Sequence, residues 1–390
     1  MKRIRIALMI ETAREYGRGI LRGIARYARL HGSWEFYLTP GDFQQALPKM
    51  KEWEGTGIIA RIQDEKTAAA IAETRLPVVA LDIPGKLRET KPYSTRFCEL
   101  RSDSVSAVML AADHFLERHF TRFAFVGNHG QVWSQLRQNA LENYLYTKGV
   151  SLEIYQVPVK SGKQIPWVTE QPCLEHWLQT LTKPIALLAC NDQRGREVLE
   201  ACQSAGINVP LEIAVMGIDN DELLCDLSNP SLTSIAMNTE RGGYLAAELL
   251  DKMMSGQKTK NQVIVVEPLY VVPRRSTDVA SIEDRDIAAA MQYIYNNVGQ
   301  ALTVDEIARQ VFLSKRSLQM RFKNIFGRTI SSEIREVKLN RARSLLQETD
   351  LSISEISELT GFGTTSYLIQ SFRESFGMTP SKYRRFIRGN

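Results

Sequence analysis

The sequence has few cysteines and histidines, and none of them is spaced like part of a reactive centre. Its 390 residues include five of each. No two cysteines show the spacing of a disulfide framework or a zinc site, and several lie inside apolar runs, which favours buried thiols. The histidines lie in separate segments. We therefore expect neither disulfides nor a bound metal.

Long apolar runs and an export leader are also missing. No apolar run approaches the ~20 residues that span a bilayer. Met1 is not followed by the charged and then apolar stretch of an export signal. We therefore expect a cytoplasmic protein with no membrane partner.

Catalytic motifs are lacking too, since the chain has no Walker loop, nucleophile elbow or visible pair of acid and base. Gly17, Gly19 and Gly23 come close to a dinucleotide fingerprint, but the third glycine is one residue late. The next predicted strand ends in Leu38-Thr39-Pro40, without the acidic partner of a ribose. These glycines indicate close helix packing or the start of a ligand-facing helix. We expect no enzyme activity and no cofactor.

Positive charge is concentrated in the last part of the chain. Residues 284–390 contain 16 Lys and Arg against 11 Asp and Glu, whereas residues 1–283 contain 33 of each. Such a division is typical of a phosphate-binding domain joined to a neutral one.

The same part of the chain contains one pattern twice, at an offset of 49 to 50 residues. Thr303-Val-Asp-Glu306 and Ser352-Ile-Ser-Glu355 are capping boxes that predict helix starts, and Gly327 and Gly377 predict helix ends. Apolar residues recur every four positions before each glycine and define one helical face. They are Leu318, Phe322 and Phe326 in the first copy and Leu368, Phe372 and Phe376 in the second. Each copy therefore predicts two helices joined by a turn.

The outer face of the second helix in the first copy is basic and amide-bearing, which suits a major groove, because Arg and Gln can pair with purine edges. Its residues are Lys315, Arg316, Gln319, Arg321 and Lys323. A helix predicted over 332–347 would hold the copies at a fixed separation, as two successive groove contacts require. For one copy alone, a helical bundle with a solvated charged face is an equal alternative. The duplication favours DNA binding.

This segment, with its closing Gly377-Met-Thr-Pro-Ser-Lys-Tyr-Arg384, resembles the AraC/XylS-type DNA-binding domain. The resemblance covers roughly the last hundred residues and implies double-stranded DNA as a partner. The side chains expected at DNA are Lys315, Arg316, Gln319, Met320, Lys323, Thr365, Ser366 and Gln370.

The first 270 residues alternate short β-branched runs with amphipathic helical patterns. The predicted strands are Ile4–Ile10, Trp34–Leu38, Gly57–Ala60, Pro77–Asp82, Phe123–Gly127, Ile185–Cys190 and Ile213–Asp219. The predicted helices are Ile20–Leu30, Ser104–Arg118, Ser134–Lys148 and Gly195–Ala205. This alternation predicts two lobes of parallel sheet flanked by helices, with ligands at the carboxyl ends of the strands.

Polar residues cluster where these strands end, at Asp82, Asn191-Asp192, Asp219 and, after the fifth strand, Arg137. Helix capping explains any one of them, but several convergent carboxylates with an arginine suit the adjacent hydroxyls of a sugar. Tyr16, Trp133 and Trp167 can cover the apolar face of a sugar ring, with core packing as the alternative.

Residues 1–272 resemble the effector core of LacI/GalR regulators and sugar-binding proteins of the ribose-binding type. The resemblance rests on Leu81-Asp82, Phe125-Val-Gly127, Cys190-Asn-Asp-Gln193 and Val215-Met-Gly-Ile-Asp219. The ligand-binding residues placed by these strand ends and this resemblance are Arg14, Tyr16, Arg18, Asp82, Trp133, Arg137, Asn191, Asp192, Arg194 and Asp219. Because Met1–Arg5 leads directly into the first predicted strand, we expect no amino-terminal helix-turn-helix of the LacI/GalR kind.

A LacI-type sensor ahead of an AraC-type reader resembles the bacterial xylose operon regulators. That resemblance implies a xylose-responsive activator of pentose catabolism genes, with D-xylose as effector. A homodimer and RNA polymerase are the further partners expected. The alternatives are another sugar, a purine, or a sugar phosphate held by Arg194 and Arg196. A transport receptor would need an export leader, and a sugar-modifying enzyme would need a catalytic pair.

These patterns divide the chain into three parts. Residues 1–272 form the predicted sensor, with one lobe from about 1–100 and 237–256 and the other from about 101–236 and 257–272. Residues 273–286, polar and rich in breakers, are a linker, and residues 287–390 are the all-α DNA-binding domain with two helix-turn-helix motifs.

Overall fold

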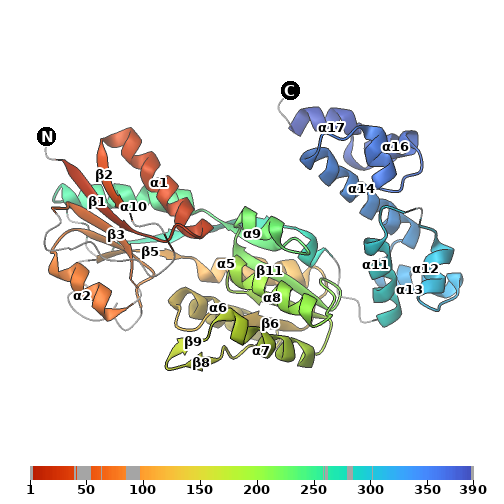
Figure 1. Ribbon diagram of the computed structural model, residues 1–390, viewed down its shortest axis with the longest axis horizontal. Coiled ribbons are helices and arrows are strands. Elements are labelled where there is room, and N and C mark those ends of the chain that lie inside the picture. The colour runs from red at the N-terminus through yellow and green to blue at the C-terminus, as the bar shows by residue number, and fades with distance from the viewer. Residues whose placement is uncertain are drawn as a thin grey trace. The chain divides into compact units, whose positions relative to one another are not determined.

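The computed structural model describes residues 3–38, 41, 54–62, 64–84, 97–257, 259, 262–278, 284–300 and 302–387. The chain forms two compact units, Met1–Ser281 and Ile282–Asn390 (Figure 1). The first unit contains two α/β lobes, and the described residues of the second form only helices. No described helix combines the length and apolar character that crossing a bilayer requires.

The first lobe is built on a six-stranded sheet in the order β13-β5-β4-β3-β1-β2, in which all neighbours are parallel. The strands are β1 (Ile4–Met9), β2 (Trp34–Leu38), β3 (Gly57–Arg61), β4 (Val78–Leu81), β5 (Phe97–Ser102) and β13 (Val263–Val266). Helices α1 (Glu15–His31) and α10 (Thr239–Met254) pack on one face, and α2 (Glu65–Glu73) packs on the other. Because both faces are covered, the central strands β3 and β4 are apolar except for Arg61, the last residue of β3.

Glycines let α1 and α10 lie side by side (Figure 1). A Cβ on Gly23 would stand 2.0 Å from the carbonyl oxygen of Glu240, and one on Gly243 would stand 2.0 Å from that of Ile20. Gly23, whose spacing suggested a nucleotide fingerprint, therefore serves close helix packing.

The second lobe has a sheet in the order β14-β12-β11-β10-β6-β7, parallel except for β14. Its strands are β6 (Phe123–Val126), β7 (Leu152–Ile154), β10 (Ile185–Ala189), β11 (Ile213–Asp219), β12 (Thr233–Met237) and β14 (Pro268–Val272). A separate hairpin contains β8 (Val159–Lys160) and β9 (Lys163–Gln164). The helices are α5 (Ser104–Leu116) and α6 (Val132–Thr147) on one face, α7 (Trp167–Thr180) and α8 (Asp192–Ser204) on the other, and the short α9 (Glu222–Leu227).

The chain crosses between the lobes three times, and the last crossing corrects a predicted boundary. Residues 257–272 were expected in the second lobe, but β13 pairs with β5 in the first sheet while β14 pairs with β12 in the second. The two strands form one apolar run interrupted at Glu267-Pro268. Nothing in that local pattern shows that its halves join different sheets.

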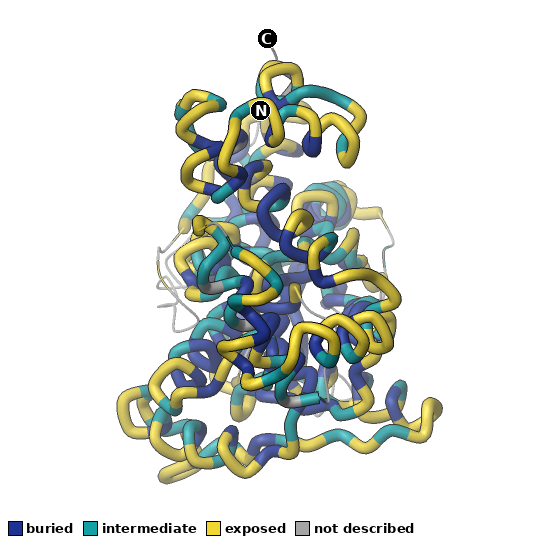
Figure 2. Tube along the Cα trace, turned by 90° about the vertical axis from the view of Figure 1, so that its right-hand side faces the viewer, coloured by how far each residue is buried: buried dark blue, intermediate teal, exposed yellow. Residues whose placement is uncertain are grey.

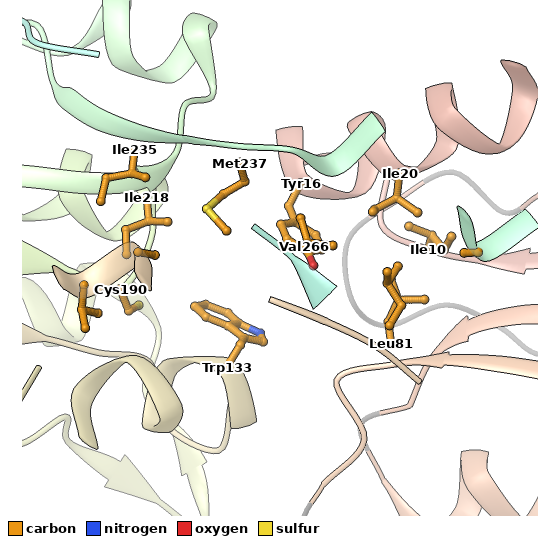
Figure 3. Packing of buried hydrophobic residues seen from close by; sticks show 14 of the residues in the cluster. Ile10, Tyr16, Ile20, Leu81, Trp133, Cys190, Ile218, Ile235, Met237 and Val266 are labelled. Carbon is orange, nitrogen blue, oxygen red and sulfur yellow. The ribbon is translucent and has the colours of Figure 1, made fainter. Parts of the chain in front are cut away.

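One hydrophobic core runs through both lobes. Figure 3 shows Trp133 and Met237 on the side of the second lobe and Tyr16 and Val266 on the side of the first, all in the same cluster. The described parts of the two lobes therefore share buried apolar surface next to the strand ends.

The second unit consists of seven described helices whose inner faces form its core. They are α11 (Arg285–Asn296), α12 (Val304–Gln310), α13 (Lys315–Phe326), α14 (Ile330–Glu348), α15 (Ile353–Leu359), α16 (Thr365–Phe376) and α17 (Pro380–Ile387). Buried and exposed residues alternate along them (Figure 2). The two predicted helix-turn-helix pairs are α12–α13 and α15–α16, with α14 between them. Gly327 and Gly377 end α13 and α16 in the left-handed conformation, at φ 68° and 72°.

One of the two predicted capping boxes is incomplete. Ser352 and Glu355 form both bonds of the box at α15. At α12, Thr303 accepts from the backbone of Glu306, but the Glu306 carboxylate instead accepts a hydrogen bond of 3.2 Å from the Tyr293 hydroxyl. A tertiary partner on α11 has replaced the local one.

Candidate functional site

A cavity lies between the two lobes at the carboxyl ends of their strands. The first lobe contributes Glu11, Arg14, Tyr16, Arg61, Asp82 and Ser102, and the second contributes Trp133, Arg137, Asn191 and Asp219. Seven of the ten predicted ligand-binding residues therefore line one cavity.

Arg61 organises the side of the cavity that belongs to the first lobe. Its Nε and Nη2 donate to the two carboxylate oxygens of Glu11 at 2.8 and 2.7 Å, and its Nη1 donates to Asp82. Burial alone would lower the pKa of Arg61, but Glu11 and Asp82 outweigh it and raise that pKa above its ordinary value. The guanidinium stays charged and holds both carboxylates toward the cavity.

The aromatic side chain of the first lobe is Tyr16. Its hydroxyl accepts a hydrogen bond of 3.1 Å from Ser102, and its ring lies 5.5 Å from the Arg61 guanidinium carbon. Burial, and after it the charge of Asp82, raises the pKa of Tyr16. The hydroxyl therefore remains protonated and can donate to a ligand oxygen.

Arg137 holds the equivalent position in the second lobe. Its Nη2 donates to Asp219 at 3.1 Å, its Nη1 donates to the Cys190 carbonyl, and its guanidinium carbon lies 5.4 Å from the ring of Trp133. The buried Nε of Arg137 has no hydrogen-bond partner among the described residues. Burial raises the pKa of Asp219 even though Arg137 opposes the shift. This lobe thus offers a guanidinium, a carboxylate and an aromatic face.

The cavity is small in this arrangement of the lobes. The volume open to the centre of a water molecule is about 20 Å³. Such a volume holds one or two water molecules. Its charged groups already pair with one another, Arg61 with Glu11 and Asp82, and Arg137 with Asp219. A sugar can therefore enter only if these side chains turn or the lobes part.

Arg18, a predicted ligand-binding residue, lies outside the cavity lining and bridges the lobes. Its Nη2 donates to Asp221 at 2.7 Å, and its Nε donates to Glu15 at 3.2 Å. The same Asp221 oxygen accepts from the backbone of Glu15 at 3.1 Å. The start of α1 is thereby tied to the loop after β11.

Asp192 also lies outside the cavity lining, where it binds the backbone of the loop after β11. Its carboxylate accepts from the Ser234 hydroxyl and from the backbone of Asp221 at 2.6 Å. Burial, followed by the nearby charge of Asp219, raises its pKa well above the usual range. A Cβ on Gly217 would stand 2.2 Å from the Asp192 carboxylate, which explains the glycine there.

Arg194 is buried on the face of the second sheet that α7 and α8 cover. It donates to the carbonyl of Gly127 at 3.0 Å and to Glu197 at 2.7 Å, and it forms a further ion pair with Glu170. Arg196 pairs with Glu200 at 2.9 Å on the exposed side of α8. Neither arginine reaches the cavity, so neither supports a phosphate site there.

Three lining residues were missed in the sequence: Glu11, Arg61 and Ser102. Each stands at or just beyond the end of a strand, which is the signal that identified Asp82 and Asp219. Arg61 ends an apolar strand and could have been found in that way.

The predicted DNA-facing side chains are accessible in the second unit. Thr365 is half-buried, and the others are exposed: Lys315, Arg316, Gln319, Met320, Lys323, Ser366 and Gln370. On α16 the Gln370 amide donates to Glu374 at 3.0 Å.

Arg321, which was expected on the outer face of α13, forms ion pairs with other residues of the second unit. It forms ion pairs with Asp284 and with Asp286, the latter at 2.9 Å. Both aspartates belong to the start of α11, so Arg321 fixes one helix of the unit to another.

A metal site is not apparent in the part of the chain that the structure describes, since no three His, Cys, Asp or Glu side chains are grouped to hold an ion. All five cysteines are free thiols, of which Cys173 alone is exposed. The geometry offers binding groups for a polyhydroxylated ligand in the first unit and two exposed helices for a groove in the second.

Comparison with known proteins divides the chain in the same way. Residues 5–97 match the XylR N-terminal domain family, residues 112–277 the periplasmic binding protein-like domain family, and residues 307–385 a helix-turn-helix domain family. The structure resembles that of the xylose-binding transcription activator XylR, with a TM-score of 0.81, 31% identity and 99% of each chain covered. A transcriptional regulator CelR–cellobiose complex, at 18% identity and a TM-score of 0.58, shares the fold over 70% of this chain and 85% of that one.

Two curated relatives match over nearly the whole chain. The xylose operon regulatory protein of Escherichia coli K12 is 34% identical, with 98% of this chain and 97% of that protein covered. The protein of the same name from Haemophilus influenzae is 33% identical, with 97% and 98% covered. The chain belongs to the family of the xylose operon regulatory proteins.

Proposed function

We propose that this protein is a xylose-responsive activator of transcription that binds double-stranded DNA as a cytoplasmic homodimer. D-Xylose enters the cavity between the lobes, and the second unit presents α13 and α16 to successive turns of the major groove. Activation proceeds by contact with RNA polymerase. The relatives' names and the AraC/XylS-like duplication support this assignment.

The observation that carries the proposal is a pair of charged networks, one from each lobe, that meet in one cavity. Arg61 with Glu11 and Asp82 faces Arg137 with Asp219. Adjacent sugar hydroxyls can accept from the guanidinium groups and donate to the carboxylates. Because these groups come from different lobes, a bound sugar favours the lobe arrangement that completes its contacts, and this preference is what can drive a response.

Calorimetry and melting temperatures measured with D-xylose, other pentoses, hexoses, sugar phosphates and purines test the ligand. A specific ligand at 100 times its Kd stabilises the folded protein by about 2.7 kcal/mol. D-Xylose should give the largest rise in melting temperature. If a sugar phosphate or a purine raised the melting temperature more than D-xylose does, the effector would belong to that ligand class instead.

Substitutions at the cavity test the site. Arg137→Ala and the milder Asp219→Asn should abolish the response of DNA binding to D-xylose while leaving DNA binding without sugar intact. Arg196→Ala, which removes an arginine on the exposed side of α8, is the matched control. A parent-like response in Arg137→Ala would place the sugar elsewhere.

A further inference from the structure

The residues that follow β14 are built into the second lobe before the chain leaves for the second unit. Ser276 and Thr277, in the short helix η1 (Arg275–Thr277), are almost completely buried. Ser276 Oγ donates to the Val215 carbonyl at 2.6 Å and accepts from the backbone of Thr233 at 2.8 Å. Residues 273–278, the first half of the predicted linker, are therefore docked on β11 and β12.

His114 on α5 fastens the same segment from the other side. Its Nε2 lies 2.9 Å from the Thr277 hydroxyl, which also lies 2.9 Å from the Thr233 hydroxyl. Only residues 279–283 separate this docked segment from Asp284, which caps the first helix of the second unit. The docked segment and the second unit are therefore only five residues apart in sequence.

Arg274 connects the docked segment to the loop after β11. Its Nη1 donates to the Asn220 side-chain oxygen at 2.9 Å and to the Leu232 carbonyl at 3.1 Å, and its Nε donates to Asp226 at 2.9 Å. Its backbone amide donates to Thr233 at 2.8 Å. The guanidinium therefore spans the gap between the start of the linker and Asn220.

Three consecutive residues, the last of β11 and the first two of that loop, have three different partners. Asp219 lines the cavity and pairs with Arg137, Asn220 accepts from Arg274, and Asp221 pairs with Arg18 of the first lobe. Asp219 and Asn220 have positive φ angles of 112° and 51°. Positive φ angles are uncommon outside glycine, although Asp and Asn adopt them more often than other residues do.

We propose that the contact between Arg274 and Asn220 transmits cavity occupancy and lobe closure to the linker of the DNA-binding unit. A ligand that draws Asp219 into new hydrogen bonds, or a lobe movement that pulls on Asp221, displaces the residue between them. Asn220 then shifts the anchor of Arg274. Arg274 is a positioning residue in this scheme, because it lies outside the cavity lining and belongs to the first unit. The scheme rests on the function proposed above.

The test separates binding from coupling. Arg274→Met keeps an aliphatic stem but removes the guanidinium, and Asn220→Gly removes the acceptor while tolerating the positive φ. Arg275→Met is the matched control, since Arg275 is the exposed neighbouring arginine. D-Xylose affinity is measured by calorimetry. DNA affinity is measured by fluorescence anisotropy, with and without the sugar, on a duplex enriched from a random pool by the parent protein.

The expected result is a loss of coupling with both binding activities retained. Coupling between two sites commonly changes affinity ~5–150-fold. In Arg274→Met and Asn220→Gly, D-xylose should change DNA affinity by less than about twofold, although each variant binds sugar and DNA separately. Arg275→Met should respond like the parent. The double variant should lose no more coupling than either single variant, because both remove one contact.

Full coupling in both single variants would overturn the proposal, as would an equal loss in Arg275→Met. The failure of the proposed function looks different, since the parent itself would then bind no sugar or enrich no duplex. Asn220→Gly leaves the Arg274 contacts with Asp226 and Leu232 in place. It therefore keeps the test decisive if Arg274→Met folds poorly.

Discussion

Polar side chains at the ends of buried strands in the first unit lie either in the cavity or away from it, according to the partners that they contact. Asp82 and Asp219 follow buried strands directly, and both line the cavity. Arg194 comes four residues after Cys190, which ends an equally clear predicted strand. Arg194 nevertheless forms an ion pair with Glu170 of α7 and does not line the cavity. Its partner lies 24 residues away in α7, so no local pattern could reveal that pairing.

His114 illustrates how one buried side chain sets a pH dependence. Burial, and next the charge of Arg118, lowers the pKa of His114 to about 4. In the unfolded chain the imidazole titrates near pH ~6.5. The unfolded state therefore binds more protons between these values, so the free energy of unfolding falls as the pH falls from 6.5 towards 4.

Urea unfolding at pH 7 and pH 5 should show this contribution as a loss of about 2 kcal/mol. His114→Gln should remove that part of the difference while its amide can still reach Thr277. His176→Gln, at an exposed position on α7, is the control and should keep the parent's pH dependence. An unchanged pH dependence in His114→Gln would contradict the assignment.

Among the helices, those with capping residues and a four-residue apolar repeat were predicted well. Helices α12 and α15 begin after Thr303 and Ser352, and α13 and α16 end at Gly327 and Gly377, as predicted. Strand β13 was not predicted, because its partner β5 lies far away in sequence and such pairing leaves no local signal. Helix α10 was missed although its buried residues, among them Gly243, Ala246 and Leu250, recur at helical spacing.

The two helices expected in the groove carry different charge. Helix α13 contains four cations and no anion, although Arg321 is held by Asp284 and Asp286, whereas α16 contains only Arg373 and Glu374. Affinity that depends on released counterions should therefore come mainly from α13.

Salt titrations of DNA binding test this difference between the helices. Lys323→Ala should lower the slope of log affinity against log salt by about 1. Arg373→Ala, at the corresponding position of α16, should lower this slope less, because the neighbouring Glu374 already offsets the charge of Arg373. Arg316→Ala should in addition relax base preference, since a guanidinium pairs with guanine. Equal slopes for Lys323→Ala and Arg373→Ala would show that both helices neutralise phosphates alike.

Arg328 is not expected to join these phosphate contacts. Its guanidinium forms ion pairs with Glu333, which is buried, and with Glu336. Arg328→Ala should therefore reduce the free energy of unfolding rather than change the salt slope. Anisotropy and urea unfolding on the same variant distinguish the two effects.

For the sensor unit taken whole, the decisive property is the balance between parted and closed lobes. The Arg18–Asp221 ion pair spans the lobes without lining the cavity. If it stabilises the closed arrangement by roughly 1 kcal/mol, as partly exposed pairs do, its loss lowers the population of that arrangement. Apparent sugar affinity falls with the population, so Arg18→Ala should weaken D-xylose binding by up to about fivefold in calorimetry. Arg22 lies one turn further along α1 but pairs with Glu15 and Glu240, both within the first lobe. Arg22→Ala should therefore leave sugar affinity unchanged, and equal losses in the two variants would mean that closure does not depend on this bridge.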